Sequence, residues 1–207
     1  MIQGVPGCPP GRTGRLWLRR RLETARRGSS LLDRRLQLLR RAQDTLRAQA
    51  QGTGLEWESR CAEADLWLLR ATLLDGRRAV TLGASRLPAE VMVSYAVAAG
   101  VRYPADATCT VPEERGFDGP ALARARQAYS AASAAAARHA AASAAVRMID
   151  AEVAATRYRL HAIEDRWIPR LEHALADVEF SLEELEHADG VRLRQLLNRE
   201  DQRQEPA

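Results

Sequence analysis

A seven-residue repeat of leucine and small residues constrains this chain more than any other feature of its sequence. Between residues 12 and 50 the spacings of these positions alternate between four and three, and Arg, Glu and Gln lie between them. The repeat runs through Leu18, Leu22, Ala25, Ser29, Leu32, Leu36, Leu39, Gln43, Leu46 and Ala50. Heptads sustained over this length are typical of an amphipathic helix that pairs with another helix along its apolar seam.

The same helix is expected to continue to residue 74. Gly52 and Gly54 interrupt the repeat, but the spacing of four, three and four then resumes in a shifted phase. The resumed positions are Ala62, Leu66, Leu69 and Leu73. A shift of this kind predicts a bend or a stutter near the two glycines, within one helix over 12–74.

A second long helix is predicted over 120–198. Pro120 suits the first turn of a helix, and residues 129–146 are nearly all Ala and Ser, which form helices readily and admit a close neighbour. An eleven-residue repeat follows, and it predicts a nearly straight seam. Its positions are Leu160, Ile163, Trp167, Leu171, Ala174, Val178, Leu182 and Leu185. Pro169 lies inside this pattern and is expected to kink the helix without ending it.

The segment 83–119 is predicted to be a small β-hairpin inserted between the helices. Pro and Gly punctuate short runs of β-branched residues there. A lone two-stranded hairpin is marginally stable in water, so it should lean on the helices or on a partner. Residues 1–11 and 199–207 are predicted to be tails. The fold class is therefore all-α, a single domain over 1–207 built from a long antiparallel two-helix coiled coil with a middle hairpin.

The antiparallel pairing follows from length. Eighty helical residues span on the order of 120 Å, which is too long to fold back on a small globule. Two such helices joined by a compact insert must pair with each other in opposite directions. This arrangement predicts that Leu18 to Leu46 lies near the seam from Leu160 to Leu185.

The distribution of charge fits the same pairing. Residues 12–47 contain twelve arginines and only three acidic residues, a composition that by itself resembles a nucleic-acid-binding helix. The far part of the second helix, residues 164–189, supplies nine acidic residues that antiparallel pairing would bring alongside. A coiled coil with complementary charges is therefore favoured over nucleic-acid binding.

No residues are assigned to catalysis, to cofactor binding or to a metal. The sequence GCPPGRT superficially resembles a phosphate-binding loop, but its spacing is one residue short, Arg replaces Lys and no strand precedes it. The four histidines lie far apart in sequence and the three cysteines form no CxxC pair. No apolar run is long enough to span a membrane, and no signal peptide is recognised. The sequence predicts a soluble, cytoplasmic, non-catalytic protein.

Composition and periodicity describe a coiled coil without stating its function, but three stretches resemble the D subunit of the V-type and A-type rotary ATPases. The first is LRRRLETARRG at residues 18–28, the second is GVRYP at 100–104, and the third is the most specific. It consists of Trp167 and the motif Ile168, Pro169, Arg170, Leu171 and Glu172, followed by an acidic helix that closes on GVRLR at 190–194. Ser29-Ser30 and Asp33 depart from the family pattern.

The resemblance implies a non-catalytic subunit in the central stalk of a V/A-type rotary ATPase or ATP synthase. It would couple ATP synthesis or hydrolysis in the hexamer of A and B subunits to proton or sodium transport. The paired chain ends would enter the cavity of the hexamer, and the arginine-rich surface would contact its acidic loops. The hairpin end would face the membrane and bind the F subunit and the socket subunit on the ion-carrying ring. The alternative is a structural or membrane-adaptor coiled coil.

Overall fold

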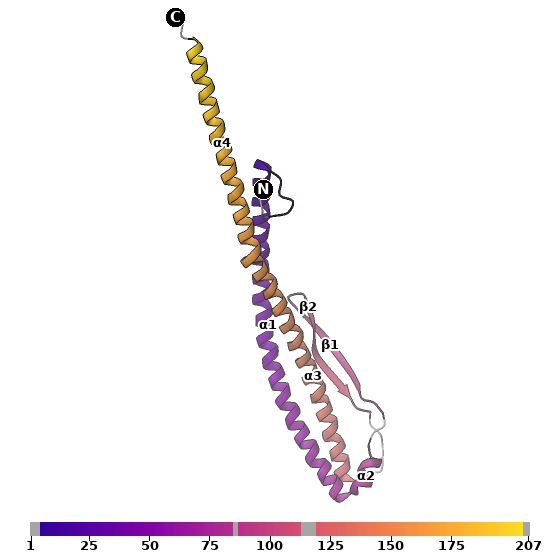
Figure 1. The fold of residues 1–207 in the computed structure, drawn as a ribbon. Helices are drawn as coiled ribbons and strands as arrows, with labels where there is room; N and C mark the ends of the chain where they lie inside the picture. The colour runs from indigo at the N-terminus through magenta and orange to yellow at the C-terminus, as the bar shows by residue number, and fades with distance from the viewer. Residues whose placement is uncertain (1–4, 85–86, 113–118, 205–207) are drawn as a thin grey trace. The chain divides into compact units, whose positions relative to one another are not determined.

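The computed structural model describes residues 5–84, 87–112 and 119–204. Parts of the predicted tails and of the predicted insert, residues 1–4, 85–86, 113–118 and 205–207, lie outside this description. The elements in chain order are α1 (Gly11–Leu74), α2 (Gly76–Leu82), β1 (Glu90–Ala98), β2 (Val101–Thr110), α3 (Pro120–His161), η1 (Ala162–Trp167) and α4 (Ile168–Gln204) (Figure 1). Long helices with one small antiparallel hairpin confirm the predicted fold class.

The chain divides into two compact units. Unit 1 comprises residues 1–34 and 156–207, and unit 2 comprises residues 35–155. Unit 1 therefore contains the start of α1, the end of α3, η1 and α4. Unit 2 contains the rest of α1, with α2, the hairpin and most of α3.

The two central glycines do not interrupt α1, which is one continuous helix of 64 residues. A Cβ atom on Gly54 would lie 3.2 Å from Cε1 of His139 on α3, whereas a Cβ on Gly52 would meet no atom within 4 Å. The His139 ring stacks on Trp57 at 5.4 Å between centroids. Gly54 thus gives room for the imidazole of the facing helix, and the helix tolerates the local cost of a glycine.

The predicted seam at the end of α1 is wrong. Ala62 is exposed, and Leu66, Leu69 and Leu73 are exposed at 47%, 58% and 76%. The buried positions are instead Ala64 and Ala71, each at 0% exposure. They pack against residues of α3, namely Ala128 and Ala132 for Ala64, and Ala121, Leu122 and Ala125 for Ala71, and all of these except Leu122 are alanines. Two helices that approach closely need small side chains at the contact. The buried positions of this part of α1 are therefore alanines, and the leucines lie on a different face of the helix.

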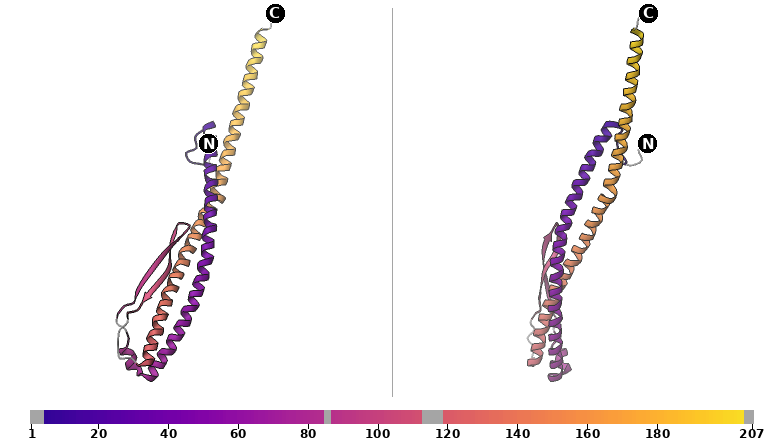
Figure 2. Two further views of the ribbon diagram at one scale, coloured as in Figure 1. Left: turned by 180° about the vertical axis from the view of Figure 1, so that it is seen from behind. Right: turned by 90° about the vertical axis from the view of Figure 1, so that its left-hand side faces the viewer.

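One apolar cluster of unit 2 joins both long helices to the hairpin. Leu39 and Leu46 of α1 pack against Ala145 and Ile149 of α3. The partly buried Ala99, Val101 and Tyr103 of the hairpin pack on this cluster, and the hairpin lies alongside α3 in the left-hand view of Figure 2.

This core corrects the predicted register for Leu39 and Leu46, which do not face residues 160–185. Both helices rise by the same distance per residue. Moving along α1 from Leu18 to Leu46 therefore corresponds to moving back by a similar number of residues along the opposite helix, to the region of Ile149.

The hairpin closes through a two-residue turn. Ala98 pairs with Val101, so Ala99 and Gly100 form the loop, and their φ angles are 48° and 82°. Positive φ at both loop residues is the geometry of the turn that matches the twist of paired strands. Strand β1 pairs only with β2 among the described residues, and its side chains are largely exposed, with Met92 at 72% and Val97 at 67%. The outer edge of β1 is therefore open.

A carboxylate from outside α3 caps the start of that helix. Asp75, between α1 and α2, accepts a hydrogen bond from the Leu122 N–H at 3.2 Å through Oδ2. The Leu122 N–H is one of the first donors of α3 and has no partner within the helix. A Cβ on Gly119 would lie 2.2 Å from Asp75 Oδ1. Gly119 is thus required for Asp75 to approach.

Replacement of Gly119 by Ala should destabilise unit 2 by about 1 kcal/mol, because the new methyl group displaces Asp75 and the Leu122 N–H loses its acceptor. Thermal unfolding followed by circular dichroism measures the effect. The matched control is Gly52→Ala, where the Cβ meets open space. This change should raise stability by about 0.5–1 kcal/mol. Equal effects of the two substitutions would contradict the proposed role of Gly119.

Candidate functional site

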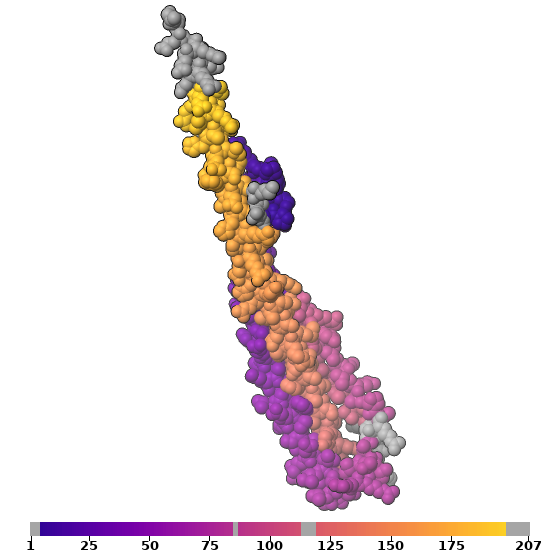
Figure 3. Space-filling view, viewed as in Figure 1, coloured from indigo at the N-terminus to yellow at the C-terminus, as the bar shows by residue number. Residues whose placement is uncertain are grey.

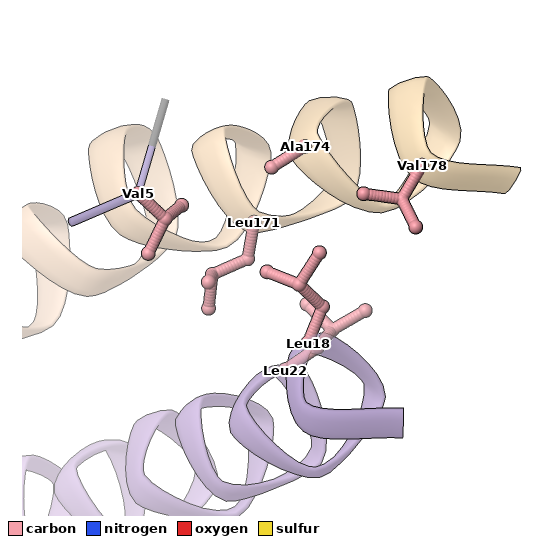
Figure 4. Packing of buried hydrophobic residues seen from close by; sticks show 6 residues of the cluster. All are labelled: Val5, Leu18, Leu22, Leu171, Ala174 and Val178. Carbon is pink, nitrogen blue, oxygen red and sulfur yellow. The ribbon is translucent and has the colours of Figure 1, made fainter. Parts of the chain in front are cut away.

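The apolar seam of unit 1 is built from two turns of α1 and three positions of α4. Leu18 and Leu22, four residues apart, face Leu171, Ala174 and Val178, which follow one another at spacings of three and four (Figure 4). Leu18 and Leu171 are both at 0% exposure. Full burial of a leucine contributes on the order of 2 kcal/mol. These side chains are therefore the main source of cohesion between α1 and α4.

The segment before α1 also belongs to this core. Val5 is buried at 7% exposure within the same cluster. In the space-filling view the N-terminal segment, coloured indigo, lies against α4 (Figure 3). The prediction of a tail over residues 1–11 does not anticipate this contact, because no periodic pattern marks a single buried valine in a Gly/Pro-rich segment.

Three ion pairs flank the seam at regular intervals. Arg12 pairs with Glu186 at 3.0 Å, Arg19 with Glu179 at 2.5 Å, and Arg26 with Glu172 at 2.7 Å. The partners are seven residues apart on each helix and run in opposite directions, so α1 and α4 are antiparallel. Exposed pairs of this kind contribute about 0–1 kcal/mol each. Their role is to select direction and register, while the seam supplies most of the stability.

A wide helical turn precedes the proline motif. Residues Ala162–Trp167 form a π-helix in which the Ile168 N–H donates to the Ile163 carbonyl, five residues back. The helical pattern of the sequence predicts a kink at Pro169. The π-helix occupies the six residues before Ile168, and Pro169 follows in the first turn of α4, where it lacks an N–H for the regular ladder.

The wide turn also carries a polar contact to α1. Ser29 donates a hydrogen bond to Glu164 at 2.6 Å. Ser29 is buried at 9% exposure, so the hydroxyl occupies a seam position of α1 and satisfies the carboxylate of η1.

The structure separates the five motif residues by exposure. Leu171 is fully buried in the seam, whereas Ile168 and Pro169 are half-buried and Arg170 and Glu172 are exposed. Ile168 packs against the unit 1 core, and Glu172 holds Arg26. Within the chain, the motif therefore supplies one buried residue of the apolar seam, Leu171, and one member of the ion-pair series, Glu172.

The remaining predicted seam residues have varied burial. Leu36, Leu39, Leu46 and Leu160 are buried, and Ala25, Leu32, Ile163, Trp167 and Leu182 are half-buried. Leu185 is exposed at 60%, so it is not a seam residue within this chain. It lies beside the last ion pair, Arg12 with Glu186, close to where α1 begins and its apolar seam ends.

A polar cluster lies in the seam of unit 2. Gln43 donates to Asp150 Oδ1 at 2.6 Å, and Arg47 contacts the same carboxylate at 3.2 Å. Arg35 pairs with Glu152 at 2.8 Å nearby. The hydrogen bond from Gln43 is the main cause that lowers the pKa of Asp150, and Arg47 adds to it against the opposing effect of desolvation. In the sequence, this cluster is indicated by Gln43, a polar residue at a heptad position that is otherwise apolar.

No group of three or more His, Cys, Asp or Glu side chains in the described part of the chain is placed to hold a metal ion. None of the described helices is long and apolar enough to cross a membrane. The candidate site is the helix-pairing surface described above, together with the faces that it leaves exposed.

Replacement of Leu171 by Asp should destabilise unit 1 by at least about 3 kcal/mol, because it removes a buried leucine and places an unpaired charge in the seam. The control is Phe180→Asp on the same helix, where the side chain is 62% exposed and the change should be nearly neutral. Chemical unfolding of both variants tests this. A wild-type unfolding curve for Leu171→Asp would show that the seam is drawn on the wrong face.

Asp150 makes the stability of unit 2 depend on pH. Its pKa is lowered in the folded chain, so its contribution is fully present above the unfolded value near 4 and is lost as pH falls through the folded value. Asp150→Asn should therefore lower the melting temperature at pH 7 by an amount equivalent to no more than about 1 kcal/mol. The difference from wild type should shrink on acidification below pH about 4. A difference that stays constant with pH would contradict this assignment.

Comparison with known proteins finds a family for this chain. The family model for the D subunit of ATP synthase matches residues 16–197, which include both helices of the seam, the hairpin and the proline motif. A search among curated proteins finds no match. The matched segment covers most of the 207 residues. The chain belongs to the family of ATP synthase D subunits.

Proposed function

We propose that this chain is the central-stalk rotor subunit of a V/A-type rotary ATPase or ATP synthase. In this role it performs no catalysis. It couples ATP synthesis or hydrolysis in the hexamer of A and B subunits to the transport of protons or sodium ions. The family match over residues 16–197 is the observation that carries the proposal.

The pairing of the helices supports a mechanical role. In unit 1, a leucine-rich seam and ion pairs at seven-residue intervals hold α1 and α4 in one register. A two-helix cross-section is not circular, so each orientation presents different side chains to a surrounding ring of subunits. Coupling between rotation and nucleotide affinity requires such a difference in contacts between orientations.

The exposed apolar surfaces support assembly with other subunits. In unit 2, Leu66, Leu69 and Leu73 keep helical spacing on the outside of α1. In unit 1, the C-terminal part of α4 exposes Val191, Leu193, Leu196 and Leu197. The proposed partners are the A/B hexamer, the F subunit and the socket subunit on the membrane ring. The rotor would lie on the cytoplasmic side, peripheral to the membrane.

Two other functions remain in competition with the rotor. A structural or membrane-adaptor coiled coil is favoured by the exposed leucines of α1, which a second copy or a lipid surface would also cover. Nucleic-acid binding is disfavoured because Arg12, Arg19 and Arg26 are each paired with a glutamate of α4.

Affinity purification of the tagged chain from its own cells should recover the A, B and F subunits. The complex should hydrolyse ATP, whereas the chain alone should not. The Leu171→Asp variant should reduce recovery, because it disrupts the seam, while Phe180→Asp serves as the control for surface charge. Recovery of homodimers or lipid without ATPase subunits would favour the adaptor. Hydrolysis by the pure chain would refute a non-catalytic role.

A further inference from the structure

The outer edge of β1 in unit 2 is open to another strand, because among the described residues β1 pairs only with β2. The nine residues of β1 include no Pro and no Lys, and Glu90 is the only charged residue among them. Strand edges without such residues pair readily with further strands. We propose that the chain, outside its complex, pairs through β1 with the β1 of a second copy. The product is an antiparallel four-stranded sheet across a two-fold axis.

The two strands of the hairpin differ in what they offer to a further strand. In β2, Pro104 has no backbone N–H, and the Asp106 carboxylate accepts a hydrogen bond from the N–H of the next residue at 2.8 Å. The bulge of the sheet is also on β2, where Ala105 is extra between the partners of Ser94 and Tyr95. β1 is therefore the regular strand of the hairpin, and the pairing is assigned to its edge.

The helices of unit 2 leave room for the second copy. The buried side chains of the hairpin, those of Pro104 and Ala107, belong to β2, whereas no residue of β1 is buried. The helices therefore pack on the β2 side. A two-fold axis normal to the sheet places β2 and its copy three strand spacings apart, about 14 Å. This separation exceeds the diameter of a helix with its side chains, about 10–12 Å, so the helices of the two copies fit beside each other.

The sequence of β1 is complementary to itself. With the two-fold axis at Ser94, all nine residues of each copy overlap. Opposing residues of an antiparallel pair project to the same face and contact each other. The opposing pairs beside Ser94 are Val93 with Tyr95, Met92 with Ala96, Val91 with Val97, and Glu90 with Ala98. No like charges face each other, since the two Glu90 carboxylates lie at opposite ends of the paired strands.

The exposed side chains of β1 favour a second copy over a strand of another protein. Met92, Val97 and Tyr95 are exposed at 72%, 67% and 55%. Each of them gains an apolar neighbour across the two-fold axis. A foreign strand would have to supply apolar side chains at the same spacing, and β1 offers it only the charge of Glu90 at one end. A second copy supplies the apolar spacing by its own sequence.

Analytical ultracentrifugation of the purified full-length chain tests the pairing, and a concentration-dependent equilibrium between monomer and dimer should appear. Met92→Lys adds a charge to the exposed edge in each copy and should weaken dimerisation roughly tenfold. The matched control is Leu69→Lys on α1 of the same unit, where the side chain is 58% exposed. This control should leave dimerisation unchanged. Circular dichroism confirms that both variants remain folded.

Disulfide formation tests the register in a chain whose three cysteines are replaced by Ser and which should itself dimerise like wild type. Ser94→Cys places two thiols opposite each other, with the Cα separation of about 4.5–5.5 Å that a disulfide bridges. Ala96→Cys places them four residues apart along the strands, about 13 Å, which is too far. After oxidation with glutathione disulfide, Ser94→Cys should give a covalent dimer on non-reducing electrophoresis, and Ala96→Cys should not.

Four results would overturn the proposal. A chain that stays monomeric at every concentration would exclude the pairing. Equal weakening by Met92→Lys and Leu69→Lys would move the interface to the exposed leucines of α1. Equal cross-linking through Ser94→Cys and Ala96→Cys would show association without a register. A monomeric chain whose Met92→Lys variant loses the A, B and F subunits would assign the edge to a strand of another subunit.

The inference goes beyond the rotor proposal and does not depend on it. Sedimentation measures the purified chain alone, whereas the rotor is tested by recovery of the A, B and F subunits with the wild-type chain. Failure of the β1 pairing would leave that recovery intact, so the two failures are distinguishable.

Discussion

Burial of apolar side chains between antiparallel helices is the interaction on which the other features of each unit depend. Isolated helices are marginal in water, and most helical stability in proteins comes from packing of an apolar face. In unit 1 the packing uses leucines, with Leu18 and Leu171 fully buried. In unit 2 much of it uses alanines such as Ala64 and Ala132, which let the helices approach closely. The hairpin and the Asp75 cap are placed by these contacts.

Electrostatics adds direction to this cohesion. The arginines of α1 and the glutamates of α4 contribute little energy one by one, because they are exposed. Because the arginines and the glutamates share a seven-residue spacing, one antiparallel register aligns all three ion pairs at once. A shift of one helix by one residue would misalign every pair. Asp150 performs a similar task in unit 2, where Gln43 and Arg47 both reach it.

The helices and the hairpin were predictable from the sequence because periodicity and Pro/Gly punctuation report on local structure. The seam leucines 18, 22 and 171 were named for the same reason. The burial of Ala64 and Ala71 in place of the neighbouring leucines was not predictable from leucine spacing, since it depends on how closely the alanine-rich helix α3 approaches. The π-helix at Ala162–Trp167 was missed because an eleven-residue repeat counts residues between inward positions and does not distinguish a wide turn from regular helix.

The open edge of β1 bears on how such a chain is made in the cell. Nine residues, EVMVSYAVA, present unpaired backbone donors and acceptors with no Lys or Pro to block another strand. Natural proteins protect edges of this kind, and here the described chain does not do so itself. A copy of the chain whose β1 edge is not covered by a partner offers a template on which another strand can pair wrongly. Synthesis of the chain in step with its neighbours is therefore a matter of solubility as well as of stoichiometry.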